Sequence, residues 1–277
     1  MRPPGPPLDA ELKKIFSSGE VISPDDADIH PLFMRHLAAY RFCIPYCVGQ
    51  KVLDVGSGEG YGSYLLSEVA AEVTGVEFNK ALVRYAQTRY GHPRLHFQQG
   101  DAGALRFAVH TFDVAVSLQV MEHIPDYLRY LYEIHRVLKP GGLAIIITPN
   151  RKTMLASINP YHFKEFSPQE FDRALSKVFR HYELRGLYGS PAYLKLKEAE
   201  QRYAKKILAL DPLRLRRILP RPLLGVFYRL GFFLVNRKTD RREKALETPI
   251  TEADFYVERG DMDQALELIG IGRKEEG

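Results

Sequence analysis

The sequence contains no tryptophan and only two cysteines among 277 residues. Cys43 and Cys47 lie four residues apart, and no further cysteine is present to build a disulfide framework or a tetrahedral metal set. We expect them to be buried thiols on one face of a helix. No apolar run reaches the ~20 residues of a membrane-spanning helix, and the amino terminus lacks the apolar centre of a secretory signal. These absences predict a cytoplasmic globular protein.

Positive charge is concentrated in one segment. Residues 191–250 carry 15 Lys and Arg against 6 Asp and Glu, whereas the rest of the chain carries 24 against 28. A protein that binds nucleic acid over its whole surface would be basic throughout. The distribution therefore predicts a local cationic patch and no nucleic-acid partner.

Short apolar runs alternate with amphipathic stretches from residue 52 to residue 150. This alternation is typical of βαβ units and predicts a doubly wound, Rossmann-like α/β fold with a parallel sheet. We expect one domain over 31–277, with a helical extension at its start, a flexible tail at 1–30 before it, and a basic helical insertion at about 191–250 before a last strand.

A glycine-rich turn follows the first expected strand, in DVGSGEGYGS at 54–63. A dinucleotide fold requires G-x-G-x-x-G, and the positions of its last glycine hold Tyr61 and Ser63 here, which weakens an NAD interpretation. The carboxylate of Asp54 would repel a pyrophosphate but suits a ligand with an ammonium group.

Further polar groups follow the next two strands. Glu77 ends the second strand, where it can accept both ribose hydroxyls, and Phe78 beside it can cover an adenine face. Asp101 follows the third strand and can accept a hydrogen bond from the exocyclic amine of adenine. Together these positions describe a site for adenosine linked to an amino acid.

With these motifs the sequence resembles the class I S-adenosylmethionine-dependent methyltransferases, and among them the bacterial small-molecule and sugar methyltransferases of the type 11 group. The resemblance runs from about Tyr40 to Tyr188, with an echo at 254–274. It departs at Ser57, where cysteine is commoner, and at Gln119, where many relatives carry an acidic or aromatic residue. The segments that carry it are DVGSGEGYGS, VTGVEFN, QQGDA, FDVAVSLQVMEHI, RVLKPGG, TPN and NPYHFKEFSPQEF.

The resemblance implies an enzyme that uses S-adenosyl-L-methionine as its cofactor. Glu77 would then bind the ribose, and Asp101 with Ala102 the adenine. The methionine end would lie at the glycine-rich turn and at the end of the fourth strand. The residues expected to bind the cofactor are Asp54, Gly56, Ser57, Gly58, Glu77, Phe78, Asp101, Ala102 and Gln119.

Methyl transfer aligns nucleophile, methyl and sulfur, and a base often takes the acceptor's proton. His123 and His162 are the candidates for this base, because each follows a strand at the carboxyl edge of the sheet. We favour His162 slightly, since its loop can fold over the acceptor. The alternatives are that His123 orders the start of a helix and that His162 makes a lid hydrogen bond. The other histidines lack ligand spacing, so no metal site is expected.

The basic insertion allows three interpretations. It can form a helical cap over the acceptor pocket, make peripheral contact with the inner membrane face through 205–240, or bind an anionic substrate or nucleic acid. A homodimer face is a further option. Its apolar run at 223–235 is too short to span a bilayer.

We expect O-methylation of a hydroxyl on a sugar, a glycan precursor or a lipid-linked metabolite. The alternatives are C- or O-methylation of a quinone-like apolar ring, and a non-catalytic adaptor that uses the fold as a scaffold. The adaptor would not require the cofactor, whereas both enzymes would.

Overall fold

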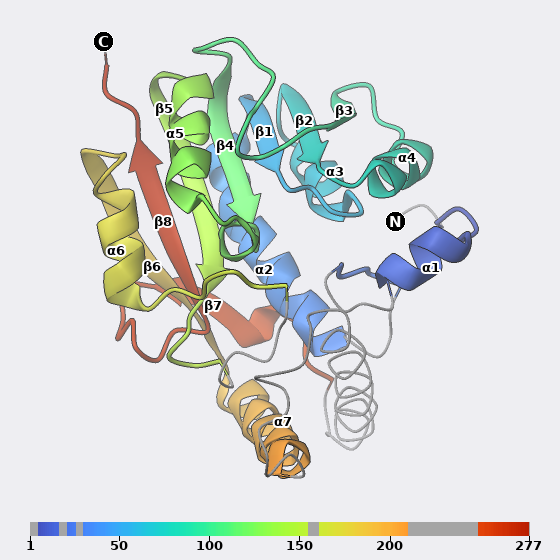
Figure 1. The fold of residues 1–277 in the computed structure, drawn as a ribbon, viewed down its shortest axis with the longest axis vertical. Helices are drawn as coiled ribbons and strands as arrows, with labels where there is room; N and C mark the ends of the chain where they lie inside the picture. Colours follow the sequence, from blue (N-terminus) through green and yellow to red (C-terminus); the bar gives the residue numbers. More distant parts are fainter. Residues whose placement is uncertain (1–4, 17–20, 26–29, 155–160, 210–248, 277) are drawn as a thin grey trace.

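An eight-stranded sheet forms the centre of the molecule in the computed structural model, which describes residues 5–16, 21–25, 30–154, 161–209 and 249–276 (Figure 1). The strand order is β3-β2-β1-β4-β5-β8-β6-β7. The strands are β1 Lys51–Val55, β2 Glu72–Glu77, β3 Leu95–Gln99, β4 Phe112–Leu118, β5 Leu138–Pro149, β6 His181–Gly189, β7 Phe255–Glu258 and β8 Glu267–Arg273.

The first five strands are parallel, and the remaining three join at one edge. β1 pairs in parallel with β2 and β4, and the parallel pairing continues to β3 and β5. β8 lies antiparallel between β5 and β6, and β7 pairs antiparallel with β6. The doubly wound α/β fold is confirmed, as is a last strand near the carboxyl terminus. The order reverses at β1 and β4, where ligands bind in open α/β sheets.

Helices cover both faces of the sheet because neighbouring strand residues point to opposite sides. Val52 packs in one core with α2 (His30–Cys47) and α3 (Tyr61–Ser67). Leu53 packs in the other with α5 (Tyr127–Val137) and α6 (Pro168–Leu175). Cys43 and Cys47 are both buried on α2, as predicted.

Within the segment expected to be a flexible tail, the structure places a helix. α1 (Ala10–Phe16) packs on α4 (Lys80–Arg89), with Leu12 against Leu82 and Tyr85. Asp25 forms an ion pair with Arg89 of α4 at 2.7 Å. Apolar residues at helical spacing along 8–16 explain this contact, and the sequence-based prediction overlooked them.

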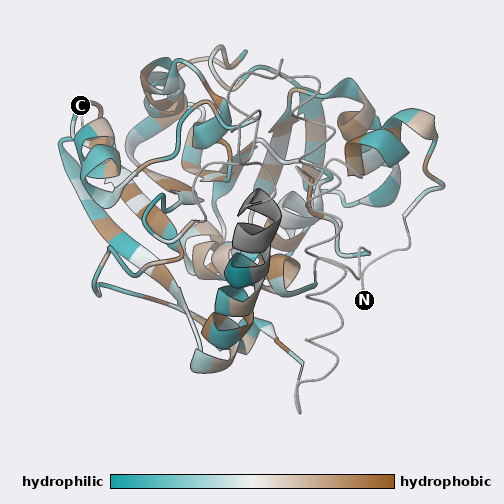
Figure 2. Cartoon of the chain, turned by 60° about the horizontal axis from the view of Figure 1, so that its bottom comes forward, coloured by the Kyte–Doolittle hydropathy of each residue, from teal (hydrophilic) through white to brown (hydrophobic). Residues whose placement is uncertain are grey.

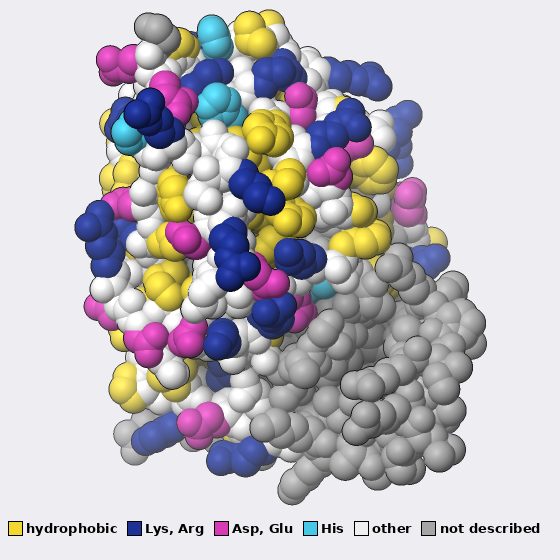
Figure 3. Space-filling view, turned by 60° about the vertical axis from the view of Figure 1, so that its left-hand side comes forward, with side chains coloured by type: hydrophobic (Ala, Val, Ile, Leu, Met, Phe, Trp, Pro, Cys, Tyr) yellow, Lys and Arg dark blue, Asp and Glu magenta, His cyan; other side chains and the backbone are white. Residues whose placement is uncertain are grey.

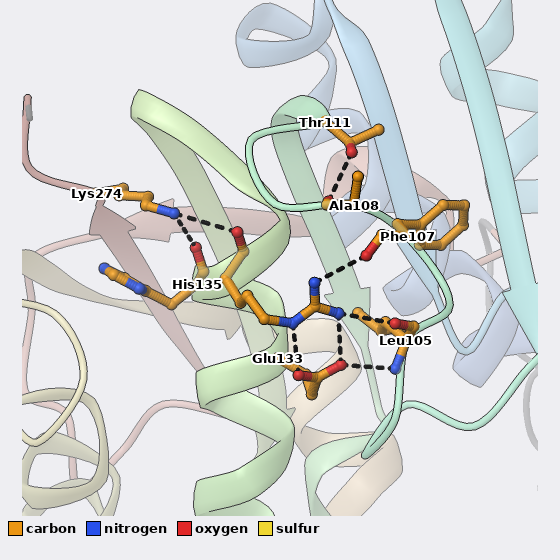
Figure 4. A network of polar contacts seen from close by, with 8 residues as sticks. Leu105, Phe107, Ala108, Thr111, Glu133, His135 and Lys274 are labelled. Carbon is orange, nitrogen blue, oxygen red and sulfur yellow. Dashed lines mark hydrogen bonds and ion pairs between the residues drawn. The ribbon is translucent and has the colours of Figure 1, made fainter.

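The chain between β3 and β4 forms turns over 102–111 and is held by α5 (Figure 4). Arg136 donates to the carbonyl oxygens of Leu105 and Phe107, both at 2.8 Å, and its guanidinium is paired with Glu133 at 2.7 Å. Glu133 also accepts from the backbone N–H of Leu105 at 2.8 Å. These contacts fix the chain just after Asp101, one of the predicted cofactor residues.

The described part of the basic insertion is the helix α7 (Pro191–Ala209), and residues 210–248 lie outside the described residues. Figure 2 shows hydrophilic and hydrophobic residues along α7. Its Tyr193 and Leu196 are buried in the core with Phe255. No described helix is long and apolar enough to cross a membrane. The helical prediction is confirmed as far as α7 extends.

Candidate active site

A cavity of about 790 Å³ lies at the carboxyl ends of β1, β2, β3 and β4. It brings together most of the predicted site residues, although they come from four separate strand ends. Asp54 and His162 are the two that do not line it. The predicted residues in its wall are Gly56, Ser57, Gly58, Glu77, Phe78, Asp101, Ala102, Gln119 and His123.

The glycine-rich loop can approach a ligand closely because of its backbone conformation. Gly56 and Gly58 have φ values of 77° and 56°, in the left-handed region. A Cβ on Gly56 would lie 2.2 Å from a Val120 methyl carbon, so no larger residue fits there. A Cβ on Gly58 would meet nothing within 4 Å, which is consistent with its place on the cavity wall.

Glu77 links the glycine-rich loop to the end of β2. Its Oε2 accepts from the backbone N–H of Gly58 at 3.1 Å and its Oε1 from that of Asn79 at 2.8 Å. Burial raises the pKa of Glu77, and the two N–H groups oppose this shift. Each carboxylate oxygen keeps a lone pair that can accept a ribose hydroxyl. Phe78 lies next to it at the cavity, 73% exposed.

Asp54 lies beneath the loop rather than on the cavity wall. Its fully buried carboxylate accepts from the Ser63 hydroxyl at 2.6 Å and lies 3.4 Å from the hydroxyl of Tyr40, which does line the cavity. Burial raises the pKa of Asp54 to about 6, against opposing hydrogen bonds from Ser63 and Tyr40. A contact between Asp54 and the methionine moiety of the cofactor therefore stays a prediction.

Replacing Asp54 with asparagine is expected to flatten the pH dependence of stability. The folded-state pKa of about 6 lies above the usual 3.8, so the Asp54 contribution is fully present below pH ~4 and is lost as pH rises through 6. The full loss is roughly 2–3 kcal/mol. Urea unfolding of the ligand-free wild type and variant between pH 4.5 and 8 measures it. Equal slopes for the two proteins would contradict the assignment.

Two buried polar atoms on the cavity wall fit a polar ligand. Among the described residues, neither Ser57 Oγ nor Gln119 Nε2 has a hydrogen-bond partner. Gln119 has a φ of 57°, uncommon for a residue other than glycine, and its backbone N–H donates to Ile147 at 2.8 Å. Such donors and acceptors can bind the carboxylate and ammonium of a methionine group, so the residues present fit S-adenosylmethionine.

His123 and His162 lie beside each other, and His123 follows β4, which β1 separates from the strands that carry Glu77 and Asp101 at their ends. Their ring centroids lie 4.8 Å apart with an interplanar angle of 85°. His123 lines the cavity, and its Nδ1 lies 3.3 Å from the Tyr161 carbonyl oxygen. Burial and the charge of His162 lower the pKa of His123 to about 4. Of the two candidate bases, His123 lines the cavity and His162 does not, and the assignment of a base stays a prediction.

Glu122 lies beside His123 and was not among the predicted site residues. Its side chain is fully buried, and its Oε2 accepts from the Thr148 hydroxyl at 3.0 Å. Burial raises the pKa of Glu122 to about 7, opposed by the charge of His162. Its backbone oxygen accepts from Phe163 N at 2.8 Å, which holds the loop after β5 against β4. The sequence signal for this cluster is the adjacent pair Glu122 and His123, together with HFKE at 162–165.

Residues of the amino-terminal segment also line the cavity, which the sequence did not predict. Ile15, Val21 and Ile22 line the cavity. Behind them Arg89 bridges Asp25 at 2.7 Å and Glu59 of the glycine-rich loop at 3.3 Å. This segment therefore forms part of the wall.

Sequence comparison matches the methyltransferase-domain family over residues 53–146. A probable S-adenosylmethionine-dependent methyltransferase of Mycolicibacterium smegmatis is 34% identical over 175 residues, 62% of this chain and 67% of that protein. Another, of Mycobacterium tuberculosis, is 33% identical over 196 residues, 69% of this chain and 70% of that protein.

Solved structures show the same fold. A possible histamine N-methyltransferase from Thermotoga maritima has a TM-score of 0.56 at 14% identity, covering 89% of this chain and 92% of that one. The [4+2]-cyclase SpnF also has a TM-score of 0.56, at 18% identity, covering 88% of this chain and 82% of that one. At these identities the likeness defines only a Rossmann-like methyltransferase fold.

Fold and site together define a class I methyltransferase architecture. The chain belongs to the S-adenosylmethionine-dependent methyltransferases. It is an enzyme, and its cofactor is S-adenosylmethionine.

Proposed function

We propose that this enzyme methylates the oxygen of a hydroxyl on a lipid-linked or similarly apolar metabolite. The observation that carries the proposal is the wall of the cavity around His123. The side chains there are Ile124, Pro125, Tyr161 and Phe163, of which Phe163 is 51% exposed. An imidazole beside apolar side chains suits an acceptor that presents a hydroxyl on an apolar body.

Two further relatives support an apolar acceptor. A phthiotriol/phenolphthiotriol dimycocerosates methyltransferase of Mycobacterium ulcerans is 38% identical over 96 residues, 34% of this chain and 35% of that protein. A demethylmenaquinone methyltransferase of Staphylococcus haemolyticus is 32% identical over 142 residues, 49% of this chain and 59% of that protein. The second keeps methylation of a quinone-like ring as the alternative candidate.

Different residues of the chain act on the cofactor and on the acceptor. S-adenosylmethionine supplies a methyl group on a sulfonium, from which the sulfur leaves with the bonding electrons as the new carbon–oxygen bond forms. Glu77 and Asp101 orient the nucleoside, so that the acceptor oxygen can be held in line at the His123 side. The hydroxyl proton leaves late, so a weakly basic imidazole such as that of His123 can accept it.

The finer roles of the basic insertion, as a cap over the acceptor pocket, a membrane contact or a dimer face, stay predictions. Buried Tyr193 and Leu196 support a structural role for α7. The coloured residues on the face of the molecule drawn in Figure 3 include Lys and Arg interspersed with Asp and Glu, as on an ordinary solvated surface. Membrane contact through 205–240 depends mainly on residues outside those described, and homodimer formation also stays a prediction.

Incubation with labelled S-adenosylmethionine and a panel of acceptors tests the proposal. We expect methyl ether formation on lipid-linked alcohols, with little transfer to free sugars or to quinol ring carbons. Phe163→Ala should raise KM for the apolar acceptor roughly tenfold, since it removes part of an apolar contact. Tyr132→Ala, an exposed aromatic outside the cavity wall, is the matched control. Transfer confined to free sugars or to carbon would overturn the proposed acceptor.

A further inference from the structure

Three metal-ligating side chains converge beside the acceptor end of the cavity. One ligand atom each from Glu122, His123 and His162 all lie within 4.8 Å of one another. The first two come from the turn after β4 and the third from the loop after β5, and the contact of Phe163 with the Glu122 backbone joins these segments. The sequence showed no such grouping, because 39 positions separate the two histidines.

Both imidazoles are oriented as metal-bound histidines usually are. His162 places its Nδ1 3.2 Å from the Glu165 carboxylate, and His123 places its Nδ1 3.3 Å from the Tyr161 carbonyl oxygen. An acceptor at Nδ1 favours the tautomer that leaves the Nε2 lone pair available for a cation. Two histidines with a purely structural role would not need both of their Nε2 lone pairs to be available.

The carboxylate of Glu122 supplies an independent indication. It is 1% exposed, and its Oε1 has no hydrogen-bond partner in the part of the chain that the structure describes. Glu165 beside His162 is also buried, at 7% exposure. A buried carboxylate oxygen without a hydrogen-bond partner is an open ligand position for a cation, and the buried Glu165 can hold the His162 imidazole in place.

We propose that Glu122, His123 and His162 bind a divalent transition-metal cation of the zinc type, with Glu165 and the Tyr161 carbonyl as outer partners. Two imidazoles and one carboxylate are a ligand set that zinc accepts. Bond lengths of about 2.0–2.1 Å place tetrahedral ligands roughly 3.3 Å apart, so small side-chain rotations suffice.

A remaining coordination position would face the cavity, because His123 lines it. The acceptor oxygen would occupy that position, a step that rests on the proposed function, whereas the metal site itself does not. A cation on His123 uses the lone pair that a base requires. In the metal-bound protein the cation would therefore replace His123 as the group that acts on the hydroxyl.

Zinc binding to the full chain, without a polyhistidine tag and stripped with a chelator, tests the site. We expect one Zn²⁺ per chain by equilibrium dialysis, at micromolar or tighter affinity. His162→Ala and Glu122→Gln should each weaken binding at least tenfold, and Glu165→Gln by about 10- to 100-fold. His96→Ala, which removes an exposed histidine on β3, should leave binding unchanged.

A second readout uses Co²⁺ in place of Zn²⁺, for which we expect the intense visible absorption of a four-coordinate site, lost in His162→Ala. Unchanged affinity for S-adenosylhomocysteine shows that each variant is folded. No stoichiometric zinc at 100 µM, or equal affinity in wild type, Glu122→Gln and His162→Ala, would overturn the site. Zinc binding without transfer to apolar hydroxyls would leave the site standing and contradict the acceptor instead.

Discussion

His123→Ala is expected to lower the turnover rate by about 10²- to 10⁴-fold, while affinity for S-adenosylhomocysteine changes little. His123 is the histidine of the pair that lines the cavity, and it follows β4, whereas Glu77 ends β2. Its loss would therefore affect the acceptor hydroxyl and not the cofactor. Single-turnover methyl transfer with saturating cofactor measures the effect, with His96→Ala as the control.

The same variant separates the two roles of His123. Parallel loss of zinc and of turnover would indicate a ligand, whereas loss of turnover with zinc retained would indicate a base. A variant that keeps near-wild-type turnover would contradict any part of His123 in catalysis, whether as a base or through a cation, and would leave positioning of the acceptor as the source of catalysis.

Glu77→Ala should weaken binding of S-adenosylhomocysteine by roughly 10- to 150-fold. The variant removes charge-assisted hydrogen bonds worth about 1.5–3 kcal/mol. It also removes the acceptor for Gly58 N–H, at 3.1 Å, which helps to hold the loop. Asp101→Ala should have a smaller effect, because that side chain is exposed.

Calorimetric titration measures this affinity, and Glu72→Ala is the matched control because it removes a carboxylate from the opposite end of β2. Urea unfolding of each variant shows whether the fold is intact. If folded Glu77→Ala binds as tightly as the wild type, the ribose position assigned to Glu77 is wrong.

The fold was predictable because its signals are local. The spacing of apolar residues marked the strands and helices. The carboxyl ends of parallel strands must meet at one edge of the sheet, so Gly58, Glu77 and Asp101 were expected to converge. The depth of Asp54 was not predictable, because burial behind Tyr40 depends on how α2 packs. A strand-end carboxylate looks alike in sequence whether it lies on the wall or beneath it.

The acceptor end was harder to predict because its contacts are long-range. Glu122 and His123 are neighbours, and adjacent side chains on an α-helix point about 100° apart. They lie in a single 3₁₀ turn, and the loop that carries His162 closes over them. Likewise, only the packing of α1 on α4 places Ile15 at the cavity.

The fold alone does not determine the chemistry, as the [4+2]-cyclase with a TM-score of 0.56 illustrates. Methyl transfer at this cavity requires that the cofactor bind in it. A crystal structure of the full chain with S-adenosylhomocysteine shows where the cofactor binds. We expect the ribose at Glu77, the adenine beside Phe78 and Ala102, and the homocysteine end at Gln119, with the sulfur facing His123. A nucleoside bound outside this cavity, or one bound in it with the homocysteine end at Asp101, would contradict this placement.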